Sequence, residues 1–407
     1  DRDDIGHLLN VGKSFKSFRY AMRIILRHQM DRLLHGRGTR LVMGNALIGR
    51  LLLSLRERKV TIVNRCNVTA LRTQGEGETG KSVTGVVLEQ DGVRREVVVR
   101  GGVVLASGGF NRHPKRRGEW LPGVSPDWCP AAPGHTGSAQ DLAIAIGASY
   151  GATELASDPA EDGKVLSHAF WAPVSIRKRA DGSVAAFPHF VMDRGKPGMI
   201  TVNQRGERFV NESTSYHLFG LAMQAADRHA PSIPAWLVCD AEALARYGLG
   251  MIRPGAKEGA SIAPFLADGY LTQGRTVAEL AAKMGADPAV LTATIERFNA
   301  AAERGVDAEF QRGSTDYQRA NGDATRSAKN PCLGALRTGP YYAIRLYPGD
   351  IGAATGLRTD AAARVLDQRG EPIAGMYACG NDMHSIMGGT YPAPGITIGP
   401  GLTFAYL

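Results

Sequence analysis

One glycine-rich stretch decides the fold class, GGTYPAPGITIGPG at residues 388–401. It follows the apolar run 376–381, which predicts a buried strand, and it leads into residues 402–406, which predict a helix. Glycines at this density let the backbone approach a flat ligand closely. The N-terminus of the following helix offers free N–H groups to an electron-rich or anionic atom. Because the ionisable phenol of Tyr391 lies inside the loop, the stretch predicts a flavin site with a tyrosine directed at the substrate.

A second glycine turn, Ala106-Ser107-Gly108-Gly109-Phe110, follows another apolar run. A turn at the carboxyl end of a sheet strand is where nucleotides bind in open α/β sheets. Short apolar runs precede it at residues 60–63, 67–71, 82–88 and 97–99, and their spacing predicts a β-meander. Together these patterns favour an α/β fold with a Rossmann-like nucleotide-binding domain.

The segment Gly75-Glu76-Gly77-Glu78-Thr79-Gly80 matches the dinucleotide pattern GxGxxG in letters only. The phosphate-binding version lies between a strand and a helix, whereas strand-like runs flank this segment on both sides. Its two glutamates would also repel a phosphate. We interpret it as a polar hairpin loop. Since the chain has no other such fingerprint, we expect an N-terminally truncated domain whose first βαβ unit is missing.

Residues 156–340 differ in character from the segments on either side. Thr276–Lys283 predicts a capped amphipathic helix, and Asp287-Pro288 opens another. The strand-rich pattern returns at Tyr341. We therefore predict a discontinuous nucleotide-binding domain, residues 1–155 and 341–407, with an inserted α+β cap domain at 156–340 that contributes to catalysis.

The composition of the 407 residues is that of a globular protein, with 43% hydrophobic and 21% charged residues. No run of about 18 apolar residues occurs, so we expect no membrane span. Five scattered cysteines without a CxxC pair predict no metal site and a reducing, cytoplasmic location. The net charge of +9 includes the clusters 115–117 and 177–179, which lack interleaved aromatic residues. We interpret them as solvated faces and expect no nucleic-acid partner.

Four segments resemble the fumarate reductase/succinate dehydrogenase flavoprotein superfamily. They are Ala106–Phe110, Gly339-Pro340-Tyr341-Tyr342-Ala343, Gly356-Leu357-Arg358-Thr359-Asp360 and Tyr377-Ala378-Cys379-Gly380-Asn381. Within this superfamily, Gly389–Gly395 is similar to the active-site loop of 3-ketosteroid Δ1-dehydrogenases. Gly206–Tyr216 resembles the cap-domain active-site stretch of the same enzymes.

The resemblance implies an FAD cofactor and a set of site residues. It implies that the Tyr391 hydroxyl and the Gly395 backbone N–H hold a ketone oxygen, and that Tyr216 takes a proton from the adjacent carbon. Polarising the ketone acidifies that C–H bond and stabilises enolate character. Eleven residues are expected to contact FAD: Asn67, Val68, Ala106, Ser107, Gly108, Gly109, Gly380, Asn381, Gly395, Thr397 and Ile398.

Three functions remain open. The first is an FAD-dependent oxidoreductase of steroid metabolism that introduces a C=C bond next to the ketone of an apolar substrate, with an unknown electron acceptor. The second is a fumarate reductase/succinate dehydrogenase-like enzyme acting on a dicarboxylate or another enoyl substrate. That chemistry requires cationic clamps, and the neutral phenol of Tyr391 favours the first. The third is a flavoprotein remnant without activity.

Overall fold

The computed structural model describes residues 14–75, 81–151, 168–190 and 193–407, together with Asp4, His7, Val11 and Gly12. Two compact units divide the chain, residues 1–67 and residues 68–407. The first unit contains the helices α2 (Phe15–His35) and α3 (Met43–Glu57). The helix α2 ends at Gly36, whose left-handed backbone (φ 71°) suits glycine.

The strand predicted at residues 60–63 is wrong, because this run belongs to no strand. Val60, Ile62 and Val63 are about half exposed, at 48%, 46% and 51%. A strand exists only where a neighbour takes its N–H and C=O groups. Among the described residues none pairs with this run, so its apolar character produces no strand.

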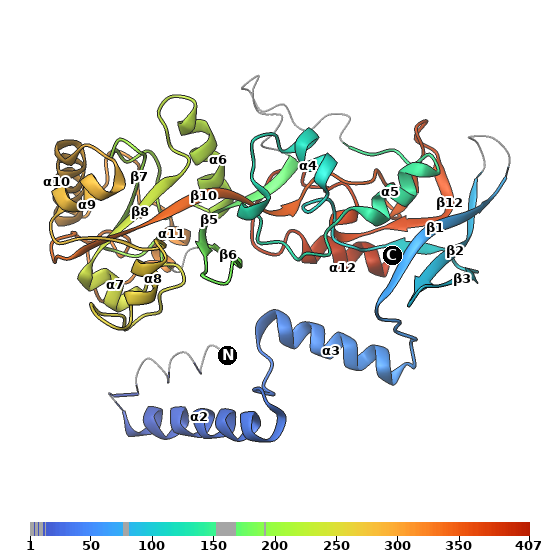
Figure 1. Cartoon of the computed structure of the whole chain (residues 1–407), viewed down its shortest axis with the longest axis horizontal. Helices are drawn as coiled ribbons and strands as arrows, with labels where there is room; N and C mark the ends of the chain where they lie inside the picture. Colours follow the sequence, from blue (N-terminus) through green and yellow to red (C-terminus); the bar gives the residue numbers. More distant parts are fainter. Residues whose placement is uncertain are drawn as a thin grey trace. The chain divides into compact units, whose positions relative to one another are not determined.

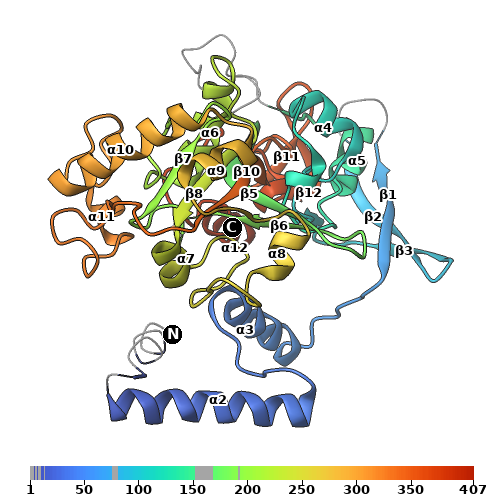
Figure 2. The same ribbon diagram turned by 60° about the vertical axis from the view of Figure 1, so that its left-hand side comes forward.

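The second unit holds a mixed sheet and an antiparallel sheet, which are seen in Figure 1 and, turned by 60°, in Figure 2. The first sheet has the order β1-β2-β12-β11, with β3 beside β2 and β4 beside β12. Its strands are β1 (Cys66–Gln74), β2 (Ser82–Gln90), β3 (Val93–Val98), β4 (Val103–Leu105), β11 (Arg364–Leu366) and β12 (Pro372–Ala378). The strand predicted at 97–99 thus begins four residues earlier. The GxGxxG hairpin loop lies largely outside the described residues, while strands flank it on both sides as predicted.

The pairing of β4 with β12 brings the two glycine stretches to one place. The two strands are parallel, with Met376 opposite Val103 and Ala378 opposite Leu105. Because the carboxyl ends of parallel strands meet at the same edge of a sheet, the turn after Leu105 and the chain after Ala378 lie side by side. A hydrophobic core that includes Leu105, Met376 and Ala378 supports this edge from below.

The second sheet has the order β6-β5-β10-β8-β7, with β9 beside β10. Its strands are β5 (Ala169–Lys178), β6 (Val184–Pro188), β7 (Met199–Val202), β8 (Ala235–Asp240), β9 (Thr272–Gly274) and β10 (Tyr341–Ala353). All residues of β7 and β8 are buried. Such continuous burial matches a sheet that is covered on both faces by the two hydrophobic cores around it.

Two helices of the second unit begin at the predicted capping residues. Thr276 and Asp287 accept backbone N–H groups at the starts of α9 and α10, as their side chains and positions predict. The helices are α4 (Pro114–Trp120), α5 (Ser138–Ala145), α6 (Tyr216–Asp227), α7 (Ala241–Tyr247), α8 (Ala263–Ala267), α9 (Val277–Met284), α10 (Pro288–Arg304), α11 (Asp316–Ala320) and α12 (Ile398–Tyr406), with 3-10 turns at Pro126–Trp128 and Gly380–Asp382.

The domain borders stay predictions. The first, at 155/156, lies in the segment 152–167, outside the described residues. The second, at 340/341, falls where β10 begins, and β10 pairs with β8 and β5 of the second sheet as far as Ala353. We propose that the cap region extends to the end of β10, because a strand shares its core with the sheet that holds it.

Candidate active site

Two tyrosines that are far apart in the sequence meet through their hydroxyl groups. The Tyr216 hydroxyl donates a hydrogen bond to the Tyr391 oxygen at 2.7 Å. Their ring centroids lie 5.1 Å apart with the planes at 68°. The two residues proposed to act on one substrate therefore share one site, although their catalytic roles remain predictions.

Tyr216 is held by the start of helix α6. Ser215 caps this helix by accepting the Leu218 N–H, which fixes Tyr216 as the first helical residue. Phe190 packs edge-on against its ring at a centroid distance of 4.9 Å. Burial, together with the hydrogen bond to Tyr391, raises the pKa of Tyr216 well above its usual range, and the positive charge of Arg194 partly opposes this rise.

Tyr391 lies in the glycine loop and is half-buried. Its ring stacks on the imidazole of His217 at 5.6 Å and 23°, and the edge of Phe170 meets it at 5.3 Å. Phe170 and Ile396 are almost fully buried and form the small core against which Tyr391 packs. The loop itself is irregular, so side-chain packing rather than a backbone ladder determines where the phenol lies.

Gly395 presents an unpaired backbone N–H group. Its φ of 102° lies in the left-handed region that favours glycine. Its carbonyl accepts the Gly399 N–H at 2.7 Å, whereas its own N–H makes no hydrogen bond within the described part of the chain. A backbone donor of this kind suits an oxygen ligand, as the oxyanion-type role of Gly395 requires.

The predicted start of the last helix is wrong by four residues. Helix α12 begins at Ile398 rather than at Leu402, so Gly399-Pro400-Gly401 forms its first turn instead of a loop. Proline fits there because the first N–H groups of a helix have no partner within the helix. The correction moves the helix N-terminus next to Thr397 and Gly395.

The turn 106–109 is held by a carboxylate that the sequence patterns missed. Asp382 is fully buried and accepts the backbone N–H groups of Ser107 and Gly109, the latter at 3.0 Å, as well as the Ser107 hydroxyl at 3.0 Å. Asp382 directly follows Asn381, which is predicted to contact FAD. An acidic residue shortly after the end of a strand was the signal in the sequence that could have identified Asp382. The N–H groups of Ser107 and Gly109 thus bond within the protein.

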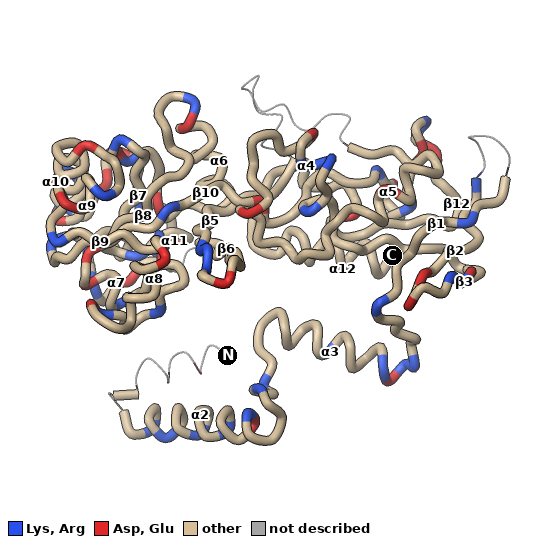
Figure 3. The backbone as a smooth tube through the Cα atoms, in the orientation of Figure 1, with Lys and Arg blue, Asp and Glu red and all other residues tan. Residues whose placement is uncertain are grey.

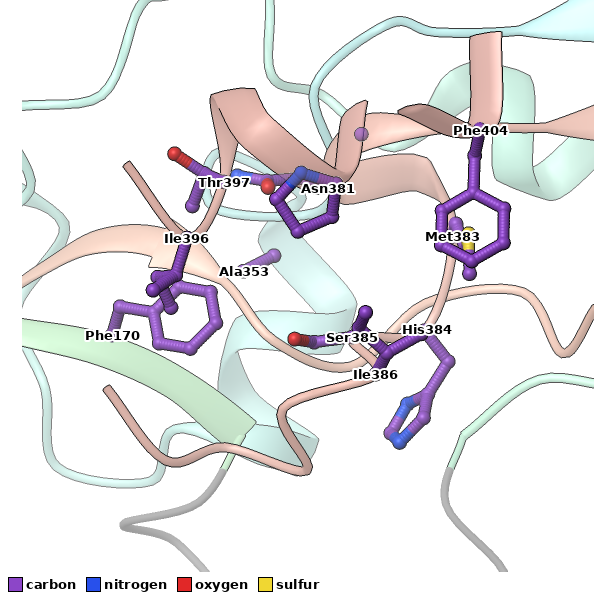
Figure 4. A pocket seen from close by; sticks show the side chains of 12 residues that line it. Phe170, Ala353, Asn381, Met383, His384, Ser385, Ile386, Ile396, Thr397 and Phe404 are labelled. Atoms are coloured by element: carbon purple, nitrogen blue, oxygen red, sulfur yellow. The ribbon is translucent and has the colours of Figure 1, made fainter. Parts of the chain in front are cut away.

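A small cavity of about 20 Å³ lies between residues of β5, the 3-10 turn Gly380–Asp382 and the start of α12. Figure 4 shows Phe170 and Ile396 on one side, Met383 and Phe404 on the opposite side, and Asn381 and Thr397 above. Phe170 and Ile396 also touch the Tyr391 cluster, so the cavity and the tyrosine pair share a wall. Its lining residues are Phe170, Ala353, Gly380, Asn381, Met383, His384, Ser385, Ile386, Ile396, Thr397, Pro400 and Phe404.

The predicted cofactor residues fall into three groups. Gly380, Asn381 and Thr397 line the cavity. The turn 106–109 stands next to it, since a Cβ atom at Gly109 would lie 2.8 Å from the Asn381 carbonyl oxygen, and Gly395 and Ile398 flank Thr397. Asn67 and Val68 lie instead at the beginning of the edge strand β1, where both are exposed. No cofactor contact has been tested for any of these residues.

The residues around the cavity fit a flavin. The fused rings of a flavin are apolar on their faces and polar at the rim, and the cavity combines apolar walls with the polar side chains of Asn381, Thr397 and Ser385. Gly380 and the start of α12 bring backbone close to the ligand space. The buried Nδ1 atoms of His135 and His384 also lack protein partners within the described residues. Such atoms are common where a ligand supplies the missing bond.

Two other kinds of feature are absent from the described residues, a membrane-spanning helix and a metal-binding cluster. None of the helices there combines the length and apolar character that crossing a membrane requires. No group of three or more His, Cys, Asp or Glu side chains gathers there as a metal-binding cluster.

Comparisons with known proteins place these features in a family. The family model described as an FAD binding domain matches residues 7–398. The chain is 34% identical over 405 residues to 4-oxocyclohex-2-ene-1-carboxylate 5-dehydrogenase of Sinomonas cyclohexanicum. This alignment covers 99% of this chain and 65% of that protein. The chain is 36% identical over 372 residues to 3-oxosteroid 1-dehydrogenase of Mycolicibacterium smegmatis. This alignment covers 90% of this chain and 61% of that protein.

A solved structure agrees with the sequence matches. The crystal structure of 3-ketosteroid delta1-dehydrogenase from Sterolibacterium denitrificans, in complex with 1,4-androstadiene-3,17-dione, is similar with a TM-score of 0.84 and 33% identity. The match covers 98% of this chain and 69% of that one. The chain spans less than two thirds of the length of the two dehydrogenases compared by sequence. These matches confirm the predicted fold class and the resemblance on which the site residues rest.

Proposed function

Because the chain belongs to the FAD-binding-domain family, as a 3-ketosteroid Δ1-dehydrogenase-like member of the fumarate reductase superfamily, we propose that it introduces a C=C bond next to a ketone with FAD as cofactor. The observation that carries the proposal is the 2.7 Å hydroxyl pair of Tyr216 and Tyr391 beside the cavity. When two phenols are in contact, one can bind the ketone oxygen while the other accepts the proton from the neighbouring carbon.

Tyr391 and Gly395 hold the ketone oxygen in this proposal. While Tyr216 keeps its proton, it donates to the Tyr391 oxygen and leaves the Tyr391 proton free to point at a substrate carbonyl. Once Tyr216 has lost its proton, the Tyr391 hydroxyl can donate either to that phenolate or to the carbonyl. The Gly395 N–H supplies a second donor. Two fixed donors at a carbonyl oxygen stabilise the negative charge that develops there as the neighbouring C–H bond breaks.

Tyr216 takes the proton from the carbon next to the ketone. A phenol whose pKa is raised is a strong base once it has lost its proton, but few molecules carry the phenolate at neutral pH. The buried charge of Arg194 acts in the opposite direction and favours the phenolate. When FAD is bound, it supplies the hydride acceptor for the second carbon, which completes the double bond.

The surroundings favour an apolar ketone over a dicarboxylate. Aromatic side chains border the tyrosine pair, namely Phe170, Phe190 and His217. The guanidinium of Arg194 donates to the carbonyl oxygens of Glu212 and Thr214 and is fully buried, so it is engaged by the backbone. A carboxylate clamp would need free cationic groups in this wall. The fumarate reductase-like alternative remains the second candidate.

The location and partners are proposed from the charge and the cysteines. All five cysteines are free thiols, which supports a reducing, cytoplasmic setting. Basic and acidic positions are interspersed along the second sheet and its helices in Figure 3, which supports a small-molecule substrate rather than nucleic acid.

The proposal is tested by reducing the FAD-loaded protein anaerobically with candidate substrates. A saturated cyclic ketone, such as a 3-oxosteroid, should bleach the visible flavin absorbance and yield the enone, whereas succinate should leave the absorbance unchanged. Bleaching by succinate alone would support the dicarboxylate reading. A protein that binds no FAD at all would support the remnant reading.

A further inference from the structure

His217 follows Tyr216 directly and is tied to the second sheet. It is 3% exposed, and its Nδ1 accepts the backbone N–H of Trp171 in β5 at 3.2 Å. An accepting Nδ1 carries no proton, so the ring proton of the neutral imidazole is on Nε2. Burial lowers the pKa of His217 to about 4, which keeps the ring neutral near pH 7. The contact joins the first turn of α6 to β5.

The same imidazole lies flat on the ring of Tyr391. The centroids are 5.6 Å apart and the planes differ by 23°. Phe170 meets both rings from the side, at 6.3 Å from His217 and 5.3 Å from Tyr391. A phenol on an irregular loop is thus held between a fixed imidazole and a buried phenyl ring, and its own backbone contributes little.

Resting on the function proposed above, we propose that His217 is a positioning residue that holds the Tyr391 ring so that its hydroxyl stays paired with Tyr216. Tyr216 and His217 are consecutive residues of one helix, so the proton acceptor and the support of the ketone donor move together. A fixed separation between two groups that act on adjacent atoms of a substrate matters, since a misplacement of about 1 Å can cost about 100-fold in rate.

The stack is set by neutral groups. Rings from two other elements contact His217: Tyr391 from the loop and Phe170 from β5. Burial is the one cause of its pKa change, so no charged neighbour contributes. The role of His217 is accordingly one of shape and of a single hydrogen bond, and it does not require the residue to transfer a proton.

A double-mutant cycle on the FAD-loaded protein tests this role. His217→Asn removes the ring but keeps an oxygen that can accept the Trp171 N–H. We expect kcat to fall about 10- to 100-fold, because the Tyr391 hydroxyl loses its position. In the Tyr391→Phe background the same substitution should change kcat less than twofold, because the hydroxyl on which it acts is gone.

The outcomes separate this inference from the proposed function. Multiplicative losses in the double variant, or wild-type kcat in His217→Asn, would overturn the positioning role. Wild-type kcat in Tyr391→Phe would instead overturn the proposed function and remove the premise. His217→Phe keeps the stacked ring and should lose less activity than His217→Asn. If the asparagine protein does not fold, His217→Phe alone decides the matter: a fall in kcat of less than tenfold supports a role for the ring, and a fall of tenfold or more contradicts it.

The contact between His217 and Tyr391 can also be tested by a measurement that needs neither cofactor nor turnover. In protein labelled with ¹³C at the tyrosine Cζ atoms, the Tyr391 signal is identified by its loss in Tyr391→Phe. It should shift in His217→Asn and keep its position in the matched control His229→Asn, which changes an exposed histidine just beyond α6. An unchanged Tyr391 signal in His217→Asn would contradict the contact.

Discussion

The two glycine stretches of the second unit differ in what surrounds them. At the turn 106–109, a Cβ atom on Gly108 would lie 2.4 Å from the His135 ring, and one on Gly109 would lie 2.8 Å from the Asn381 carbonyl oxygen. At Gly395 an added Cβ atom meets nothing within 4 Å. The first turn also has its N–H groups bound by Asp382, whereas the Gly395 N–H has no partner within the described residues.

The glycines of the two stretches therefore serve different purposes. Glycines of the turn 106–109 are needed for space, because the backbone lies against neighbouring atoms. Gly395 is needed for its backbone angle, since its φ of 102° favours glycine. The first stretch therefore belongs to the frame of the site, and we propose that the second offers groups to a ligand. Substitutions in the two stretches should fail in different ways.

Gly109→Ala should have the largest effect and should act on the frame. A left-handed backbone costs a non-glycine residue about 1–3 kcal/mol, and overpacking against Asn381 and Ala353 costs about 1–3 kcal/mol more. We expect a clear fall in the midpoint of thermal unfolding and weaker FAD binding, measured by calorimetry and flavin fluorescence. Gly118→Ala is the control, since its Cβ meets nothing within 4 Å and its φ is ordinary. A wild-type midpoint in Gly109→Ala would refute the tight packing.

Tyr391→Phe should act on chemistry alone. It keeps the ring and its contacts with His217 and Phe170, and it removes one donor. Loss of one oxyanion-type donor costs about 10²–10³ in rate, or about 3–4 kcal/mol. Steady-state kcat should fall by this factor, while FAD content and the thermal midpoint stay unchanged. Tyr406→Phe, at a 91% exposed position, is the matched control. Wild-type turnover on every ketone tested would mean that the loop tyrosine is structural.

The dependence of kcat on pH should report the protonation state of Tyr216, the proposed base. Tyr216 acts without its proton, and burial with the Tyr391 contact raises its pKa above the usual value of about 10. Below that pKa the phenolate fraction grows about tenfold per pH unit, so kcat should rise steadily from pH 7 to pH 9. A profile that is flat above pH 7 would argue against Tyr216 as the base. The rise should vanish in Tyr216→Phe.

Much of the fold could be predicted because its signals are local. The capped helices at Thr276 and Asp287 and the strands before both glycine stretches depend on neighbouring residues in the sequence. The run 60–63 failed because apolar character alone cannot show whether a partner strand exists. The start of α12 failed because Gly399-Pro400-Gly401 is typical of a loop, although proline is compatible with a first turn.

The site residues also divide into those with a local signal in the sequence and those without one. The loop pattern predicts Tyr391, and the family resemblance implies Gly395 and Tyr216. The meeting of Tyr216 with Tyr391 depends on a contact across 175 residues of sequence. Asp382 and His217 were missed although each stands next to a chosen residue. Their importance comes from the Ser107 and Gly109 amides and from the Trp171 amide, which are distant in sequence. Asn67 and Val68 lie exposed in the edge strand β1, and their contact with FAD stays a prediction.

Gly395→Ala should have the smallest effect and gives the sharpest test of the contrast. The new methyl group has open space, so the cost is the left-handed backbone alone, about 1–2 kcal/mol. The N–H is retained, so kcat should fall less than tenfold, and the thermal midpoint should drop less than in Gly109→Ala. Both values come from the same calorimetric and kinetic assays. If Gly395→Ala destabilises the protein as much as Gly109→Ala, the loop is packed as tightly as the turn. In that case the Gly395 N–H is held by the protein rather than offered to a ligand.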